Sequence, residues 1–430
     1  MPMRTALVRC RQLSVPALNV RSHATWASVV EQATSAIKGS VRGTPADEES
    51  VAAYRRDPLA VVGEELSTMR NSVSTLLGSG TESLGRIAKY YFQAEGKNVR
   101  PMIVLLIAKA TNGLSPAWAP QREAGVGASV NIPISSPDIL RDSNPDAPPA
   151  TMLDSAPSAS GELSHTILPT QRRLAEITEM IHVASLLHDD VIDASPLRRG
   201  TPSAPSVFGN KLSILGGDFL LGRASIALAR LRDDEVVELM STVIANLVEG
   251  EVMQMRTEAV HIPVTDVAAT QPADTTLEEY WTRPGECLPK SERSPGVPLF
   301  RQYLQKTYLK TASLIAKSAR SAAVLGGCSR EAALEHGLGE AAAAKAAEIC
   351  DAVYEFGRNV GVAFQLVDDL LDFRSTSEAF GKPSGGADME LGLATAPVLF
   401  AWQEMPDSGI YELVQRRFSE PGDVHKVRCY

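Results

Sequence analysis

The sequence predicts an all-α fold, and three observations support this prediction. Apolar residues recur every three to four positions over long stretches, runs that alternate β-branched with polar residues are few, and proline- and serine-rich segments separate the helical stretches. With 430 residues, of which 44% are hydrophobic and 22% charged, the chain can bury a sizeable core. One large domain or two medium ones would fit this length.

The predicted helices follow one another along most of the chain. In each of them the apolar residues gather on one face at helical spacing. The clearest examples are residues 91–110, 171–190, 213–231, 235–254 and 352–373.

Two segments lose this periodicity, one at about 114–170 and one at about 257–298. Both are rich in proline, serine, threonine and aspartate. Such a composition buries too little apolar surface to offset the entropy of ordering the chain. We therefore expect two flexible surface insertions rather than separate domains.

The N-terminus, residues 1–30, has a composition of its own. It contains four arginines together with serine and small apolar residues, and its first acidic residue is Glu31. This composition is typical of a mitochondrial transit peptide. A disordered basic tail is the alternative interpretation.

Net charge and cysteine spacing exclude several classes of function. The formal charge of −9 provides no basic field for nucleic acid. The five cysteines lie far apart without C-x-x-C spacing, which argues against a zinc site or a disulfide framework and suits a reducing compartment. Charged residues interrupt every apolar run before the roughly 18 residues that a membrane span needs. We expect a soluble or peripheral protein.

An acidic cluster, "LLHDDVID" at 186–193, follows an apolar helical run. On a helix, Asp189 and Asp193 lie one turn apart on one face, and His182 is only about 20° away from that face. Asp190 lies beside them.

A second cluster, "FQLVDDLLDF" at 364–373, repeats the pattern. Asp368 and Asp372 share a face, Asp369 lies beside them, and Gln365 comes one turn earlier. One DDxxD cluster alone could be a solvated helix end. Two clusters of partly buried, repelling carboxylates require positive charge between them. Because Mg²⁺ prefers oxygen ligands and bridges carboxylates to phosphates, the pair indicates a magnesium diphosphate site.

Basic and polar residues near these clusters could complete such a site. Each of them alone is typical of a solvated surface residue. Beside an acidic cluster, however, they could bind phosphate, and guanidinium groups in particular can do so bidentately. The candidates are Lys97, Arg100, Arg198, Arg199, Lys310, Thr311 and Lys382.

Together, "GKNVRP", "IHVASLLHDDVIDASPLRRG", "YLKTASL", "GVAFQLVDDLLDF", "GKP" and "DMELGLATAPVLFA" resemble the motifs of the trans-isoprenyl diphosphate synthases. The resemblance is to their mitochondrial long-chain branch, and it runs in order from about residue 55 to 430 outside the two insertions. It implies one catalytic domain, 55–430, folded as an isoprenoid synthase helical bundle around a deep central cavity. It also implies that the two acidic clusters face each other across the cavity mouth, in a homodimer or a heteromer.

The resemblance implies a role for each candidate residue. Asp189, Asp190, Asp193, Asp368, Asp369 and Lys310 are expected to be catalytic. The Mg²⁺ ligands are expected to be Asp189, Asp190, Asp193, Asp368, Asp369 and Asp372. Isopentenyl diphosphate would bind Lys97, Arg100, His182 and Arg199, and the allylic diphosphate would bind Arg198, Lys310, Thr311, Gln365 and Lys382.

The implied activity is that of a prenyltransferase. It would condense isopentenyl diphosphate onto farnesyl or geranylgeranyl diphosphate and make the hexaprenyl to decaprenyl precursor of the ubiquinone side chain. We expect it in the mitochondrial matrix, with peripheral contact to the inner membrane through its lipid product. Small residues before the first cluster, Ala184 and Ser185, predict a cavity floor open to long chains. Their other interpretation is tight helix packing.

Two alternatives belong to other classes of protein. A terpene cyclase would need no second substrate pocket such as "GKNVRP" with His182. A non-catalytic or truncated subunit of a heteromeric synthase would be expected to lack aspartates that are present here. Two departures from the family pattern are Leu393, where many relatives carry lysine, and the ending "GDVHKVRCY", beyond which relatives continue.

Overall fold

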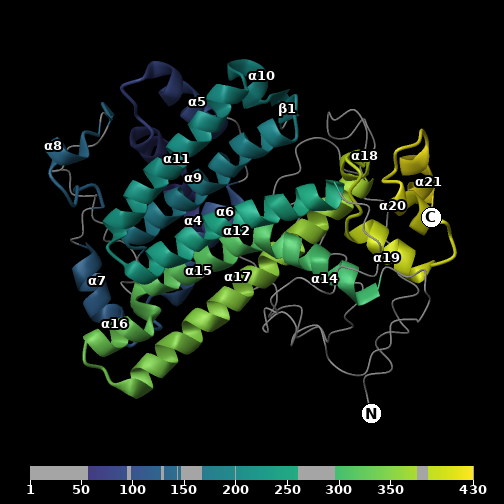
Figure 1. Ribbon diagram of the computed structural model, residues 1–430. Coiled ribbons are helices and arrows are strands. Elements are labelled where there is room, and N and C mark those ends of the chain that lie inside the picture. The colour runs from purple at the N-terminus through teal and green to yellow at the C-terminus, as the bar shows by residue number, and fades with distance from the viewer. Residues whose placement is uncertain are drawn as a thin grey trace, which may run out of the picture.

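The computed structural model describes residues 57–93, 98–126, 130–142, 144–146, 167–198, 200–259, 296–374 and 386–429. Over these residues the predicted all-α class is confirmed (Figure 1). The only strands there form a minimal hairpin, in which β1 (Leu197–Arg198) pairs antiparallel with β2 (Thr201–Pro202).

Eight long helices form the main bundle in the described part of the chain. They are α4 (Pro58–Leu76), α5 (Glu82–Gln93), α6 (Val99–Thr111), α9 (Pro169–Ile192), α11 (Asn210–Leu231), α12 (Asp234–Ala259), α15 (Ser313–Ala323) and α17 (Glu340–Arg374). Helix α9 packs against α11, α6, α15 and α4. Its apolar residues, such as Met180, Ile181 and Leu187, are fully buried in the main core. The bundle is therefore built around α9, which carries the first acidic cluster.

Shorter elements extend these helices. Helix α14 (Gly296–Thr307) continues through the π-helical turn η4 (Tyr308–Ala312) into α15, and a second π turn, η5 (Val324–Cys328), leads to α16 (Arg330–Glu335). Helix α10 (Ala204–Phe208) joins the hairpin to α11.

The predicted helix at 91–110 is divided in two. Helix α5 ends at Gln93, and α6 begins at Val99 after Asn98, whose φ of 45° is left-handed. Asparagine tolerates that conformation better than most residues do. Pro101 lies in the first turn of α6, where its missing N–H removes no intrahelical hydrogen bond.

Part of the segment predicted as the first flexible insertion packs on the bundle. It contains α7 (Trp118–Val126) and α8 (Pro137–Leu140). Arg223 of α11 donates to both carboxylate oxygens of Asp142 at 2.7 Å, and the Asn144 amide donates to the Thr75 carbonyl at 2.9 Å. The prediction does not hold here, because polar residues that indicate a solvated loop are paired with the bundle. Most of the second insertion lies outside the described residues.

A second, smaller core lies at the C-terminal end, coloured yellow in Figure 1. It is built by α18 (Ala387–Glu390), α19 (Ala396–Glu404), α20 (Ile410–Gln415) and α21 (Asp423–Cys429). Trp402, Leu399 and Ile410 are buried there, and Tyr303 of α14 joins them. Phe373 of α17 packs against the same cluster. This C-terminal core therefore supports the end of α17, where the second acidic cluster lies.

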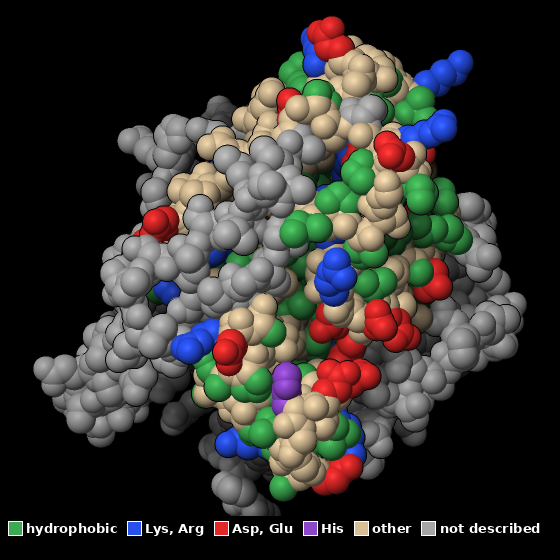
Figure 2. All heavy atoms as spheres, turned by 90° about the vertical axis from the view of Figure 1, so that its left-hand side faces the viewer, with side chains coloured by type: hydrophobic (Ala, Val, Ile, Leu, Met, Phe, Trp, Pro, Cys, Tyr) green, Lys and Arg blue, Asp and Glu red, His purple; other side chains and the backbone are tan. Residues whose placement is uncertain are grey.

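Helix α11 is long and apolar enough to cross a membrane by length and composition, the one such helix in the described part of the chain. Its packing against α9 and α5, and the ion pair of its Arg223 with Asp142, are those of a bundle helix. Figure 2 shows one end of the molecule, where basic side chains are scattered and acidic ones gather in the lower half of the view. That described surface carries no broad basic patch.

Candidate active site

The first acidic cluster lies at the C-terminal end of α9. Asp189 and Asp190 belong to its last turns, and Asp193 caps the helix by donating its backbone N–H to the Asp189 carbonyl at 2.8 Å. The β1–β2 hairpin that follows brings Arg198 back toward this end of α9. Helix α9 thus ends at the acidic cluster, and the hairpin places the Arg198 side chain against it.

Asp190 is the aspartate of this cluster that is fully buried, with an exposed fraction of 0%. Its Oδ1 accepts from Arg198 Nε at 2.7 Å and lies 2.6 Å from Nη2. Its Oδ2 accepts the hydroxyl of Tyr91 from α5, and that hydroxyl in turn accepts the backbone N–H of Ala204 at 2.8 Å. Burial is the main cause that raises the pKa of Tyr91, so the tyrosine remains a donor. Both Asp190 oxygens are therefore occupied by protein donors.

Burial disfavours the charged form of the other two carboxylates, Asp189 and Asp193. Burial, opposed by Lys310 and reinforced by Glu251 and Asp193, raises the pKa of Asp189 to about 7. Burial also raises the pKa of Asp193. Carboxylates in this condition gain stability from a bound cation, which is the condition that a magnesium site requires.

Lys310 lies on the π turn η4, facing α12. Its Nζ donates to a Glu251 carboxylate oxygen and to Gln254 Oε1, the latter at 3.1 Å. A Cβ at Gly250 would lie only 2.7 Å from the Lys310 Cγ, so this glycine lets the lysine approach. Glu251 and Gln254 were not predicted as site residues, although their spacing in "GEVMQ" places them on one helical face. π turns are rare and are common at functional sites.

The second acidic cluster lies near the C-terminal end of α17. Asp369 is nearly fully buried, and its Oδ2 accepts the hydroxyl of Tyr303 at 2.6 Å. Its Oδ1 accepts Gln365 Nε2 at 2.7 Å, and Gln365 Oε1 accepts the hydroxyl of Thr311 at 2.8 Å. The structure thus joins Thr311, Gln365 and Asp369, three predicted site residues, in one hydrogen-bonded chain.

The flanking aspartates of this cluster, Asp368 and Asp372, are more exposed than Asp369. Asp388 of α18, which was not predicted as a site residue, donates its backbone N–H to Asp372 Oδ2 at 3.1 Å. Burial and the neighbouring Asp372 raise the pKa of Asp388 to about 7. No local spacing signals this carboxylate, because it stands 16 positions away from Asp372 in the sequence.

Arg100 and His182 meet between α6 and α9. The Arg100 Nη1 lies 3.0 Å from His182 Nε2, and because a guanidinium only donates, that ring nitrogen is the acceptor. The Arg100 guanidinium carbon also lies 5.9 Å from the ring centre of Phe364 on α17. Below them, Ala184 is fully buried in the main core, and Ser185 donates its hydroxyl to the His182 carbonyl at 2.8 Å.

Three predicted substrate-binding residues, Lys97, Arg199 and Lys382, lie outside the described residues. Leu393 is buried, and its N–H bonds to the Asp388 carbonyl at 2.9 Å. The apolar side chain is therefore accommodated by burial at this position.

The donor set fits a magnesium diphosphate. Among the described residues, no three His, Cys, Asp or Glu side chains lie close enough to form a metal site from protein ligands alone. Mg²⁺ commonly takes only one or two carboxylates, with water and substrate phosphate completing its octahedron. Asp189, Asp193, Asp368 and Asp372 offer such carboxylates.

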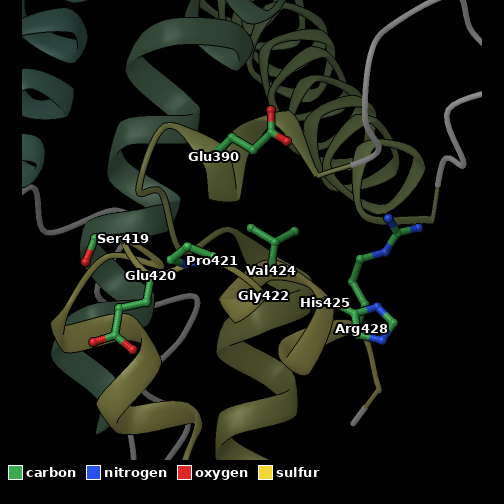
Figure 3. A pocket seen from close by; sticks show the side chains of 8 residues that line it. All are labelled: Glu390, Ser419, Glu420, Pro421, Gly422, Val424, His425 and Arg428. Carbon is green, nitrogen blue, oxygen red and sulfur yellow. The ribbon is translucent and has the colours of Figure 1, made fainter.

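A surface pocket of about 570 Å³ lies elsewhere, between α18 and the C-terminal helices (Figure 3). Glu390 lies on one side of it, and His425 and Arg428 lie together on another. None of the predicted site residues lines it. The pocket is therefore not the site that the acidic clusters form.

Comparison with known proteins agrees with this geometry. The chain is 47% identical over 414 residues to a probable mitochondrial hexaprenyl pyrophosphate synthase of Neurospora crassa, covering 95% of this chain and 78% of that one. It is 40% identical over 397 residues to the mitochondrial hexaprenyl pyrophosphate synthase of Saccharomyces cerevisiae, covering 86% and 80%. It is 38% identical over 373 residues to decaprenyl-diphosphate synthase subunit 1 of Schizosaccharomyces pombe, covering 87% and 79%.

The fold also has a solved counterpart. A decaprenyl diphosphate synthase from Rhodobacter capsulatus superposes with a TM-score of 0.55 at 22% identity, covering 86% of this chain and 83% of that one. The family model described as Polyprenyl synthetase matches residues 149–430. This match, which spans both acidic clusters, and the identity to the fungal proteins show that the chain belongs to the polyprenyl synthetase family.

Proposed function

We propose that the protein is a long-chain trans-polyprenyl diphosphate synthase that adds isopentenyl diphosphate to an allylic diphosphate. The observation that carries the proposal is the pair of acidic clusters. Lys310 and Arg198 lie close to the first, and Thr311, the neighbour of Lys310, bonds to Gln365 of the second. Arg100 and His182, which pair on a neighbouring face, supply cationic and polar groups for a second diphosphate.

The reaction needs charge stabilisation rather than a protein nucleophile. The allylic C–O bond breaks and the diphosphate leaves with the electron pair, where Lys310 and Arg198 donate hydrogen bonds to it. The double bond of isopentenyl diphosphate then attacks the allylic cation, and a new C–C bond forms. Loss of a proton to the departing diphosphate restores a double bond. Mg²⁺, when bound, would neutralise the diphosphate and favour its departure.

The side chains of the main core would protect the cation. The α9 residues below the first cluster are apolar, as Leu187, Val183 and Ala184 illustrate. An apolar path excludes water, which would otherwise trap the allylic cation as an alcohol. A growing prenyl chain would be held along the same residues between rounds of addition.

The relatives support the proposed product and location. The names of the fungal relatives specify hexaprenyl and decaprenyl products, and two of these relatives are called mitochondrial. We therefore propose a hexaprenyl to decaprenyl product that supplies the ubiquinone side chain, and import into the matrix by residues 1–30. A fluorescent fusion to residues 1–30 should enter mitochondria, and a cytosolic fusion would contradict this part.

The direct test is incubation of the purified protein with farnesyl or geranylgeranyl diphosphate, labelled isopentenyl diphosphate and Mg²⁺. Chromatography of the products should show chains of six to ten units. Asp189→Asn serves as the inactive control. A cyclic hydrocarbon formed from the allylic substrate alone would instead identify a terpene cyclase.

We also propose that the enzyme forms a homodimer through α11. This helix exposes large apolar side chains at Ile214, Leu215 and Ile226, although it belongs to the main core on its other face. Light scattering should give twice the monomer mass. The double variant Ile214→Glu, Leu215→Glu should be monomeric, and a monomeric wild-type protein would contradict the proposal.

A heteromeric synthase is the second candidate. It is favoured by the relative from Schizosaccharomyces pombe, whose name is subunit 1 of such an enzyme. In this case the purified chain would be inactive alone and would become active when a second subunit is supplied by co-expression.

A further inference from the structure

The middle aspartate of each acidic cluster is held in the same way. Asp190 and Asp369 are the two buried aspartates of their clusters, and both oxygens of each accept hydrogen bonds from protein side chains. In each case one oxygen accepts a tyrosine hydroxyl from another helix, Tyr91 in the first cluster and Tyr303 in the second. Tyr91 and Asp190 are 99 positions apart, and Tyr303 and Asp369 are 66 positions apart, so no sequence spacing generates this repeat.

We propose that Tyr91 and Tyr303 are positioning residues of the diphosphate site. Each holds the middle aspartate of one cluster through its hydroxyl, and that aspartate orients neighbouring donors instead of binding the metal. The inference rests on the proposed function, because the donors are those that would meet a diphosphate.

In the first cluster, the oriented donor is Arg198. The Asp190 carboxylate binds its Nε and Nη2, which leaves Nη1 to turn toward a ligand. The Tyr91 hydroxyl secures the opposite carboxylate oxygen and also accepts the N–H of Ala204, at the start of α10. Tyr91 thus connects α5, the end of α9 and the start of α10, which follows the β1–β2 hairpin.

In the second cluster, the oriented donors belong to the helix that carries Tyr303 itself. Tyr303 lies seven residues, two turns, before Lys310 on the continuous helix α14–η4–α15. Its hydrogen bond to Asp369 fixes α17 against that helix. The Asp369–Gln365–Thr311 chain of hydrogen bonds fixes α17 a second time, beside Lys310. Two contacts on either side of Lys310 therefore determine its position relative to α17.

Both oxygens of each middle aspartate are occupied by side-chain donors. A carboxylate that already accepts a tyrosine hydroxyl and a guanidinium or amide has to lose those bonds before it can bind a cation at those oxygens. Residues that orient a metal site from behind its ligands are commonly worth about 10- to 100-fold in affinity or activity. We expect the two tyrosines to have effects of this size.

The test uses Tyr91→Phe and Tyr303→Phe, which each remove one oxygen and keep the ring. The matched controls are Tyr90→Phe, whose hydroxyl bonds to the Pro202 carbonyl at 2.9 Å, and Tyr411→Phe, whose ring lies in the C-terminal core. We expect kcat to fall about 10- to 100-fold in the first two and less than about 2-fold in the controls. The KM for the allylic substrate should rise, with that for isopentenyl diphosphate unchanged.

A second pair of variants separates positioning from metal binding. Asp190→Asn keeps an oxygen acceptor and should leave the half-saturating Mg²⁺ concentration within about 3-fold, whereas Asp189→Asn should raise it about 10-fold or more. The same order should appear without turnover, in the rise of Tm that Mg²⁺ with inorganic diphosphate produces. Equal shifts for Asp190→Asn and Asp189→Asn, or wild-type kinetics in both tyrosine variants, would overturn the proposal. A wild-type protein that stays inactive both alone and with a co-expressed second subunit would instead refute the proposed function, and the Tm series would still test the positioning roles.

Discussion

The two acidic clusters share an internal arrangement and differ in what supports them. The first lies at the end of α9, the helix around which the main core is built, and the second lies on α17 against the small C-terminal core. In the first cluster, the carboxylate whose pKa burial raises to about 7 is Asp189, a member of the motif, whereas beside the second cluster it is Asp388, a residue outside the motif. The same motif therefore does not guarantee the same surroundings.

This difference predicts unequal robustness. Elements held by few buried contacts open at lower free energy than the central helices of a core. The short helices α18–α21 bury far fewer residues than the main bundle does. We expect the second cluster to lose its geometry first under mild destabilisation, while the first persists.

The largest expected effect is common to both clusters. Asp189→Ala and Asp368→Ala should each lower turnover at least about 100-fold, because each removes a carboxylate that we assign to the metal. Circular dichroism should show the helical fold intact. Full activity in excess chelator would contradict the metal dependence of both.

The next prediction tests whether the second cluster depends on the C-terminal core. Trp402 is almost completely buried there, and Trp402→Ala should destabilise this core by about 3–5 kcal/mol. We expect faster proteolysis after α17 and loss of activity at a temperature where the main bundle remains helical. Glu404→Ala, at an exposed position on the same helix, is the control. Simultaneous loss of all helical signal would show that the two cores unfold as one.

The approach of Lys310 to the first cluster can be tested through Gly250. In Gly250→Ala the new methyl would lie 2.7 Å from Lys310 Cγ and 3.0 Å from Leu309 Cβ, so the lysine has to shift. We expect activity to fall about 10-fold or more. Gly222→Ala is the matched control, because its Cβ meets nothing within 4 Å and alanine favours a helix by up to about 1 kcal/mol. Equal activity of the two variants would show that Gly250 does not control the position of the lysine.

The sequence was sufficient to predict the helices that carry the clusters. The periodicity of 171–190, 213–231 and 352–373 falls within α9, α11 and α17, because long amphipathic helices repeat one signal many times. The short helices α18–α21 repeat it too few times to be recognised. The anchored part of the first insertion was missed for another reason, since Asp142 is paired with Arg223 across 81 positions.

The site residues that could be predicted are those that lie close together in the sequence. Asp189 with Asp193, and Asp368 with Gln365, are neighbours on one helical turn, and spacing reveals them. Tyr91, Tyr303, Glu251 and Asp388 were not predicted, because each reaches the site from another helix. The π turn at Lys310 packs against α12 and α17, and no residue pattern in the sequence predicts it.

The raised pKa of Asp189 gives a pH-dependent prediction. Because the folded value, about 7, exceeds the unfolded one, protonation stabilises the metal-free fold below about pH 4, and this contribution is lost as the pH rises through about 7. Asp189→Asn should therefore raise the Tm of the metal-free protein at pH 8 and change it little at pH 4. Thermal unfolding followed by circular dichroism at both pH values measures the effect. Asp388→Asn should behave alike, and a variant less stable than wild type at pH 8 would contradict the sign.

The smallest effect on turnover, and the clearest on product, should come from the residues one turn before each cluster. Four residues before the first aspartate stands Ser185 in the first cluster and Phe364 in the second, and the Phe364 ring already lies beside Arg100. The small residue before the first cluster and the aromatic ring before the second favour a growing chain that follows α9 rather than α17.

Ser185→Phe should then shorten the product clearly, with turnover of short chains retained. Ser185 is partly exposed and makes one hydroxyl bond to the His182 carbonyl, so Ser185→Ala, which removes that bond without adding bulk, is the control and should leave chain length unchanged. Ala184→Phe is a less direct test, because this residue is fully buried and overpacking there should cost about 1–3 kcal/mol of stability. Chromatographic sizing decides the matter: unchanged chain length in a fully active Ser185→Phe enzyme would place the limit elsewhere and remove this difference between the two clusters.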